Sequence, residues 1–442
     1  MRDIAITLIV FGALPFIMAR PWIGILMWSW LGYMNPHRLS WGFAFDFPFS
    51  QVTALATLLG FLFAADRRYI TNGVVAVWAL FCAWITVTTF FAIDQVTAWE
   101  NWEQMIKVQL FAALTVILIH SRERLQMLVW VIALSLGFFG LKGGLFVFRT
   151  GGESLVWGPP GSFIEDNNAL ALALIMVVPL MWFLYTQATQ RYVRWFLVLA
   201  MILTSASVLG SQSRGAALAG VGMLGALWLK SAPRFRWRLG LALLVAAPVV
   251  LAVMPQEYFD RIKSISEFEQ DGSSMGRIRA WRAATAIAVE RPIVGGGFNS
   301  IVEANYRRFA PEVAQEIDEF DPGHFSEAHS IYFKVLGDHG FVGLLLYLML
   351  GVLGYRAAGR LRRQADDRPD LAWAGALGAM VQVSVVGYAV GGAFLGLSYF
   401  DLYYCLISLV LGAEIAVREQ LATPVPAAQP ESGAETSARP AY

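Results

Sequence analysis

Residues 167–186 read NNALALALIMVVPLMWFLYT, a run of 20 residues without a charged side chain. The hydrocarbon layer of a bilayer is roughly 30 Å thick and takes about 20 helical residues to cross. Similar runs recur along the whole chain, whose 442 residues are 57% hydrophobic and only 15% charged. Soluble domains are nearer a quarter charged. The sequence therefore predicts an all-α polytopic membrane protein.

Thirteen apolar segments can be delimited along the chain. They lie at about residues 4–19, 21–35, 51–65, 74–92, 104–120, 125–148, 167–186, 193–210, 214–229, 239–255, 335–355, 371–394 and 399–417. The first two are short and separated only by Arg20 and Pro21, so we expect about 12 transmembrane helices. Residues 1–255 would form a helical bundle, 256–334 a large and partly helical loop domain, 335–417 the final spans, and 418–442 a disordered tail.

The orientation follows from the distribution of Lys and Arg between short loops. One alternating set of loops, around residues 66–68, 121–124, 190–194, 230–238 and 356–368, holds 15 of them. The opposite set holds three, namely Arg38, Arg149 and Arg214. Cytoplasmic loops carry the excess of positive charge. The loop domain at 256–334 should therefore lie outside, and the tail in the cytoplasm.

Two groups of arginines could bind an anion on that outer side. Arg214 follows Ser213 at the outer end of a span, and Arg277, Trp281 and Arg282 lie on a predicted amphipathic helix in the loop domain. A guanidinium group offers a rigid fork of donors that matches phosphate oxygens. The alternatives are an interfacial anchor for Arg214 and the charged face of a surface helix for the others.

Histidines cluster near the end of the same loop. Three of the five, His324, His329 and His339, fall within 16 residues of one another. Histidine has the side-chain pKa nearest neutrality, so His329 or His339 could take a proton from an attacking hydroxyl. A zinc site is the rival reading, but the spacings match no standard ligand pattern and no cysteine is near. We expect neither a metal nor another cofactor.

The remaining polar residues are more ambiguous. Asp166 should cap the span that begins at Asn167; Asn167 and Asn168, with Trp281 and Tyr332, could line a polar cavity. Lys142 interrupts an apolar run, which would suit a transport pathway. The two cysteines, Cys82 and Cys405, lie in apolar segments and should be small buried side chains.

Several short motifs resemble the O-antigen ligase and polymerase family of membrane glycosyltransferases. They are the stretches 213–215 (SRG), 276–277 (GR) with Trp281, 292–295 (PIVG), 329–332 (HSIY) and 337–340 (GDHG). The amino-terminal stretches 20–22 (RPW) and 33–38 (YMNPHR) further resemble a subgroup associated with exosortase systems, the putative O-glycosylation ligases.

The resemblance implies a donor glycan on undecaprenyl diphosphate, presented at the periplasmic face of the bacterial inner membrane. By position in the motifs, Arg214, Arg277 and Arg282 would bind the diphosphate and His329 would activate the acceptor hydroxyl, with His339 as the other candidate. The acceptor would be lipid A–core or a protein, and we expect membrane lipid but no nucleic acid as a further partner. Direct displacement would invert the anomeric configuration.

Two other functions stay open. A polymerase of the same family would extend one lipid-linked glycan with another. A transporter of lipid-linked glycans would place its ligands near the bilayer midplane, and Lys142 is the main feature that favours it.

Overall fold

The computed structural model describes residues 1–231, a few positions between 236 and 248, 272–366 and 368–422. All regular elements in these residues are helical. The α-helices are α1 (Arg2–Ala19), α2 (Trp22–Met34), α3 (Phe49–Phe63), α4 (Gly73–Phe90), α5 (Gln95–Leu118), α6 (Arg122–Thr150), α7 (Asn167–Gln187), α8 (Arg191–Gly210), α9 (Arg214–Lys230), α12 (Gly272–Glu290), α13 (Glu303–Phe309), α14 (Pro311–Phe320), α15 (Ile331–Ala365), α16 (Ala372–Gly392) and α17 (Asp401–Ala422), with short 3-10 helices η1 (Pro36–Leu39), η2 (Phe43–Phe45) and η4 (Pro369–Leu371). The predicted all-α class is confirmed.

Seven of the described helices are long and apolar enough to cross a membrane: α1, α4, α6, α7, α8, α15 and the stretch 369–392 that contains α16. The other predicted crossings fall on shorter helices, such as α2, α3 and α9, or on α5 and α17, which carry charged side chains. Most of the tenth predicted segment, 239–255, and nearly all of the predicted tail lie outside the described residues. The count of 12 crossings stays a prediction.

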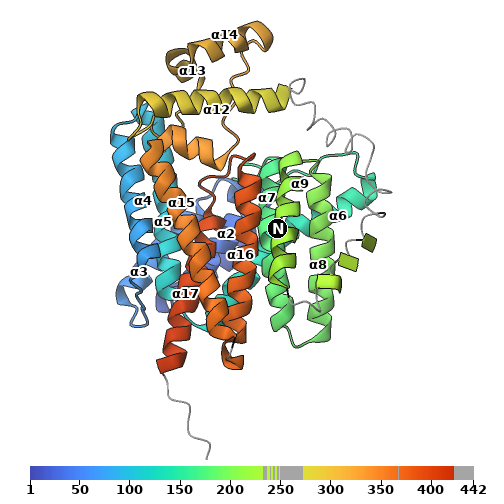
Figure 1. Ribbon diagram of the computed structural model, residues 1–442. Coiled ribbons are helices and arrows are strands. Elements are labelled where there is room, and N and C mark those ends of the chain that lie inside the picture. Colours follow the sequence, from blue (N-terminus) through green and yellow to red (C-terminus); the bar gives the residue numbers. More distant parts are fainter. Residues whose placement is uncertain are drawn as a thin grey trace, which may run out of the picture.

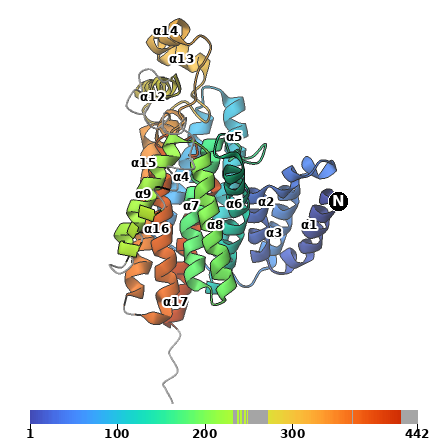
Figure 2. The ribbon, with the colours of Figure 1, turned by 90° about the vertical axis from the view of Figure 1, so that its right-hand side faces the viewer.

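Helix α7, the opening stretch of the sequence analysis, lies at the centre of the bundle. The Asp166 carboxylate caps it, accepting hydrogen bonds from the backbone N–H groups of Asn168 and Ala169 at 2.9 and 3.2 Å, as expected for an N-cap aspartate. The helix is apolar all round, which suits burial on every side. It packs against α6, α8, α9 and α16, and Figure 2 shows it between α9 on one side and α2 on the other.

Charged residues gather at the end of the bundle where the positive loops were predicted. Arg68 pairs with Glu419, the Arg124 guanidinium with Asp66, and Arg360 with Glu414 at 2.8 Å. These pairs join loops 64–72 and 119–124 to the ends of α15 and α17. The predicted loop domain lies at the opposite end of the bundle (Figure 1).

The described part of that loop domain is a helical layer above the bundle, made of α12, α13 and α14 (Figure 1). It has its own small core, in which Val313, Ala314 and Ile317 of α14 pack against alanines of α12. Arg279 and Arg282 of α12 both pair with Glu316 of α14, at 2.9 and 2.7 Å. An apolar core and ion pairs, among them the shared Glu316 carboxylate and the pair of Arg307 on α13 with Asp318 on α14, thus hold the layer together.

Helix α15 is two helices joined by a kink at Gly340, whose φ and ψ are 67° and −170°. The kink docks on the turn that follows α12. Backbone N–H groups of Gly296 and Gly297 donate to the carbonyls of Gly337 and Asp338, both at 2.8 Å, and Phe341 N–H donates to Pro292 at 2.9 Å. We call this contact, residues 292–297 with 337–341, the kink joint. It separates a short outer segment, 331–339, from the long span that follows.

Replacing Gly340 with alanine should destabilise the protein. A Cβ at this position would lie 2.6 Å from the Ile293 carbonyl oxygen, and left-handed backbone costs a residue with a Cβ about 1–2 kcal/mol even without a clash. We expect a lower midpoint of thermal unfolding in detergent for Gly340→Ala. The control is Gly225→Ala on α9, where a Cβ meets no atom within 4 Å; an equal loss in both variants would contradict the role of the kink joint.

Candidate functional site

His329 lies immediately before α15, on the outer side of the kink joint. Its backbone has a φ of 41°, in the left-handed region that side chains other than glycine rarely adopt. Trp281 of α12 fixes the preceding residue, because its indole N–H donates to the Ala328 carbonyl at 2.7 Å. On the other side, Gly396 lies next to the histidine: a Cβ there would be at an ordinary contact distance, 3.6 Å, from the His329 Cα. Such strain is typical of residues held for a function.

The imidazole of His329 is exposed, yet enough protein surrounds it that partial desolvation is the largest effect on its pKa and lowers it. The positive charge of Arg277 lowers this pKa further. Glu327 and Asp166 oppose the shift without reversing it. His329 is therefore mostly neutral at neutral pH, which is the state that can accept a proton.

Arg277 and Trp281 are four residues apart on α12 and share the face that looks toward His329. Trp281 stacks on Phe333 with ring centroids 4.9 Å apart and planes within 9° of each other. Gly276, just before the arginine, has room for no side chain, since a Cβ would approach the Ser326 hydroxyl to 2.7 Å. Arg277 itself is half-buried, and its charge acts on His329.

Arg214 is the first residue of α9 and is half-buried. The turn before it is also strained, since Gln212 has a φ of 52°, and the Ser213 hydroxyl caps the helix by accepting from the Ala216 N–H at 3.2 Å. Gly215 packs on the loop between α16 and α17, where its Cβ would lie 3.2 Å from Phe394.

The loop 394–396 therefore touches three parts of the site. Gly215 beside Arg214 packs on Phe394 and Leu395, the Trp281 ring lies 6.3 Å from the Phe394 ring, and Gly396 contacts His329. Sequence reasoning could not find this loop, because it holds only apolar and glycine residues.

The residues that were predicted to line a polar cavity form hydrogen bonds that join the helices around the site. The Asn167 side-chain amide donates to the Ser211 carbonyl at 2.7 Å, and Asn168 donates to the Asn167 oxygen at 3.2 Å. These bonds tie α7 to the turn between α8 and α9. Tyr332 donates its hydroxyl to the Ala389 carbonyl at 2.7 Å and so anchors α15 on α16.

Two predicted site residues lie elsewhere. Arg282 points away from His329 and pairs with Glu316 at 2.7 Å; hydrogen bonds from Arg279 and Arg282 lower the pKa of that carboxyl. His339 is fully buried in the kink joint, with its Nδ1 2.7 Å from the Thr88 hydroxyl and its ring against Phe298. The structure therefore does not bring the two candidate histidines together.

Asp338 is the buried polar residue that the sequence analysis did not single out. It is fully buried, and it accepts hydrogen bonds from the Ser300 N–H and hydroxyl, both at 3.0 Å, and from the Tyr399 hydroxyl at 2.9 Å. The Lys334 ammonium lies 3.8 Å away. The motif 337–340 was visible in the sequence, but its aspartate stabilises the kink joint. In the described residues, no group of three or more His, Cys, Asp or Glu side chains is arranged to hold a metal ion.

Comparison with known families assigns two parts of the chain differently. Residues 199–348 match the family model described as O-Antigen ligase, a segment that includes Arg214, Arg277 and His329. Residues 1–189 match a family of unknown function (DUF5935). Comparison with curated proteins gives no match.

The O-antigen ligase match over residues 199–348 confirms, for this segment, the relationship to the O-antigen ligase/polymerase family that its motifs predicted. The likeness of residues 20–38 to the exosortase-associated subgroup stays a prediction. Members of this family are membrane glycosyltransferase-like enzymes.

The histidines should differ sharply in their reaction with diethyl pyrocarbonate, which modifies accessible, uncharged imidazole. His324 and His329 are exposed, whereas His120 is 4% and His339 0% exposed. We expect carbethoxylation of His324 and His329 well before the other two when the folded protein in detergent is digested and analysed by mass spectrometry. Modification of His339 as fast as His329 would contradict the burial described above.

Proposed function

We propose that the protein transfers a glycan from undecaprenyl diphosphate to a hydroxyl of lipid A–core or of a protein, at the periplasmic face of the bacterial inner membrane. The observation that carries the proposal is a neutral, exposed histidine beside a half-buried arginine, within the segment that matches the O-antigen ligase family. A hydroxyl acceptor needs a base, and a departing diphosphate needs positive charge.

The donor diphosphate would lie between Arg277 and Arg214. Arginine matches phosphate oxygens with two parallel hydrogen bonds. Arg214 adds a second source of positive potential, because it stands at the first turn of α9, where the helix dipole is positive. Arg282 is not part of this proposed site, since it is paired with Glu316.

The proposed reaction is a single displacement. The acceptor oxygen forms a bond to the anomeric carbon while its proton moves to Nδ1 or Nε2 of His329. The bond between that carbon and the diphosphate oxygen breaks, and the electron pair leaves with undecaprenyl diphosphate, whose added charge the arginines stabilise. The configuration at the carbon inverts, and the imidazolium then returns its proton to water. No step requires a metal.

The polymerase alternative uses the same residues, and only the acceptor distinguishes it. Transport is less favoured, because Lys142 lies on an exposed face of α6 rather than in the interior of the bundle. The resemblance of residues 20–38 to ligases associated with exosortase systems supports an acceptor other than a second lipid-linked glycan.

The main test is transfer of a lipid-linked glycan to purified lipid A–core in detergent with EDTA. We expect product from the wild type, and a loss of about 10²–10⁴-fold in kcat for His329→Ala, the range that a general base contributes. His324→Ala and Arg282→Ala are matched controls, because both residues are exposed in the same layer but lie outside the proposed site; they should keep full activity.

Equal product from wild type and His329→Ala would remove the histidine from the mechanism. A product only with a second lipid-linked repeat unit as acceptor would make the protein a polymerase, and dependence on added divalent metal would contradict the proposed charge stabilisation by arginine.

The pH dependence of kcat/KM should report the ionisation of His329. Its pKa lies below the usual value, so activity should be constant near neutrality and fall as acid protonates the imidazole. Glu327 raises this pKa and Arg277 lowers it, so Glu327→Gln should move the acid limb to lower pH and Arg277→Gln to higher pH. Shifts in the same direction in both variants, or none, would show that another group controls the profile.

A further inference from the structure

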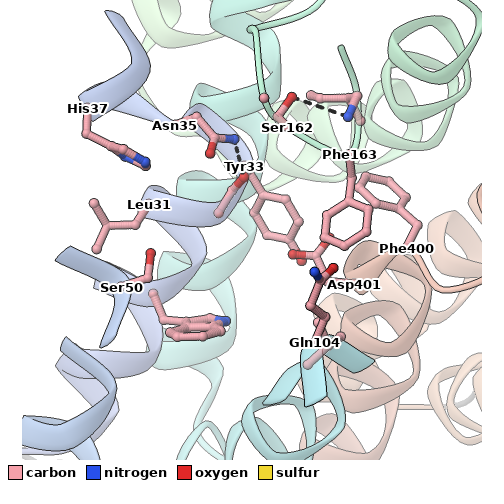
Figure 3. A pocket seen from close by; sticks show the side chains of 15 residues that line it. Leu31, Tyr33, Asn35, His37, Ser50, Gln104, Ser162, Phe163, Phe400 and Asp401 are labelled. Carbon is pink, nitrogen blue, oxygen red and sulfur yellow. Dashed lines mark hydrogen bonds between the residues drawn. The ribbon is translucent and has the colours of Figure 1, made fainter. Parts of the chain in front are cut away.

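A cavity separate from Arg214 and Arg277 opens between the amino-terminal helices and α17. It has a volume of about 430 Å³, within the roughly 300–1,000 Å³ typical of small-molecule sites. Its walls come from α2, α5, the loop 161–164 and the first turn of α17. Figure 3 shows these side chains converging from different helices. Most of the lining lies in the amino-terminal region of unknown function.

The polar groups of the cavity both donate and accept hydrogen bonds. Gln104 and Ser50 make no side-chain hydrogen bond to any described residue, so their capacity is available to a ligand. Asn35 uses its amide to donate to the Gly32 carbonyl at 2.7 Å, which leaves its oxygen to accept. Sugar hydroxyls also donate and accept, whereas an amine only donates and a phosphate mainly accepts.

The cavity offers no positive charge to an anionic ligand. Among the described residues, Asp401 is the one acidic residue of its lining, and no lysine or arginine lines it. Arg38, which lies behind Gly161, is paired with Asp46 at 3.4 Å. Burial and the charge of Arg38 lower the pKa of the lining His37, so that histidine is neutral as well.

Aromatic rings complete the lining. Figure 3 shows the rings of Tyr33, Phe163 and Phe400 close to the Asp401 carboxylate. An aromatic face carries partial negative charge and so attracts the C–H face of a pyranose, while the amides and the carboxylate bind its hydroxyls.

Two short stretches of chain link the lining of the cavity to the proposed catalytic site. Gly396 contacts His329, and Phe400, four residues later, lines the cavity. In the other stretch, Ile164 lines the cavity, and Asp166, two residues later, raises the pKa of His329. Helix α9, which begins at Arg214, lies on the opposite side of α7 from α2 (Figure 2), so the cavity is on the side away from this part of the proposed diphosphate site.

We propose that this cavity is a subsite for an uncharged saccharide of the acceptor, which it positions with a free hydroxyl toward His329. The assignment of the saccharide to the acceptor rests on the proposed function; the binding of a neutral sugar does not. The two parts can therefore fail separately.

Binding can be tested without catalysis by thiol protection. Ser50→Cys places a thiol on the cavity wall. The rate at which a charged maleimide labels this thiol is measured alone and in the presence of neutral mono- to trisaccharides, of a sugar phosphate or of ethanolamine. We expect at least one neutral saccharide to slow labelling about threefold or more, and the other two probes to have no effect. The protection should disappear when Gly32→Leu fills the cavity and persist with Gly32→Ala, whose Cβ would lie at an ordinary 3.5 Å from Asp401.

Protection by ethanolamine alone, or by no probe, would overturn the saccharide assignment. A further variant separates charge from hydrogen bonding: Asp401→Asn should keep protection within a few-fold, whereas Asp401→Ala should lose it. Equal loss of saccharide protection in both would contradict the proposed hydrogen bonding of the sugar by Asp401.

The acceptor role is tested in the transfer assay. Gln104→Ala should raise the KM for lipid A–core severalfold, with kcat and the KM for the donor unchanged. Protection without this KM effect would keep the sugar site and remove its acceptor role. If no transfer is seen with the wild type, the proposed function fails while the protection result stands.

Discussion

The backbone hydrogen bonds of the kink joint determine where the candidate site lies. A straight α15 would carry residues 331–339 further along the axis of the span, and His329 with them. The joint instead turns this segment beneath α12, so that the histidine meets Arg277 and Trp281. Ile93 also donates to the Gly296 carbonyl at 2.8 Å, which ties the turn between α4 and α5 to the same point. One glycine-rich contact thus fixes three segments that are distant in sequence.

Asp338 shows how such a joint can be stable at the outer end of a bundle. A buried carboxylate is costly unless hydrogen bonds replace its hydration, and here two groups of Ser300 and the Tyr399 hydroxyl do so. The cost of burial then favours one arrangement of three segments, because any other would leave the carboxylate without donors. His339 occupies the same joint, next to Thr88, and packs there as a structural side chain.

The sequence predicted the helical bundle, the helical layer above it and the proximity of Arg277 to His329, because hydropathy and charge act locally along the chain. The place of Arg214 in the same site stays a prediction. Helical spacing also put Arg277 and Trp281 on one face. Helical spacing does not predict which face of α12 packs against α14. Arg282 was therefore grouped with Arg277, although it pairs with Glu316 on α14. The loop 394–396 and the cavity at Asp401 depend on contacts between distant segments of ordinary composition, which a single sequence does not reveal.

The position of α17 has a consequence for biogenesis. Its first turn supplies Asp401 to the cavity, and the loop just before it packs against both His329 and Gly215. These residues follow the matched ligase segment, 199–348, in the chain, so both candidate sites stay incomplete until α17 has been synthesised and inserted. A nascent chain that contains the whole matched segment but not yet α17 therefore lacks contacts on which the candidate site depends.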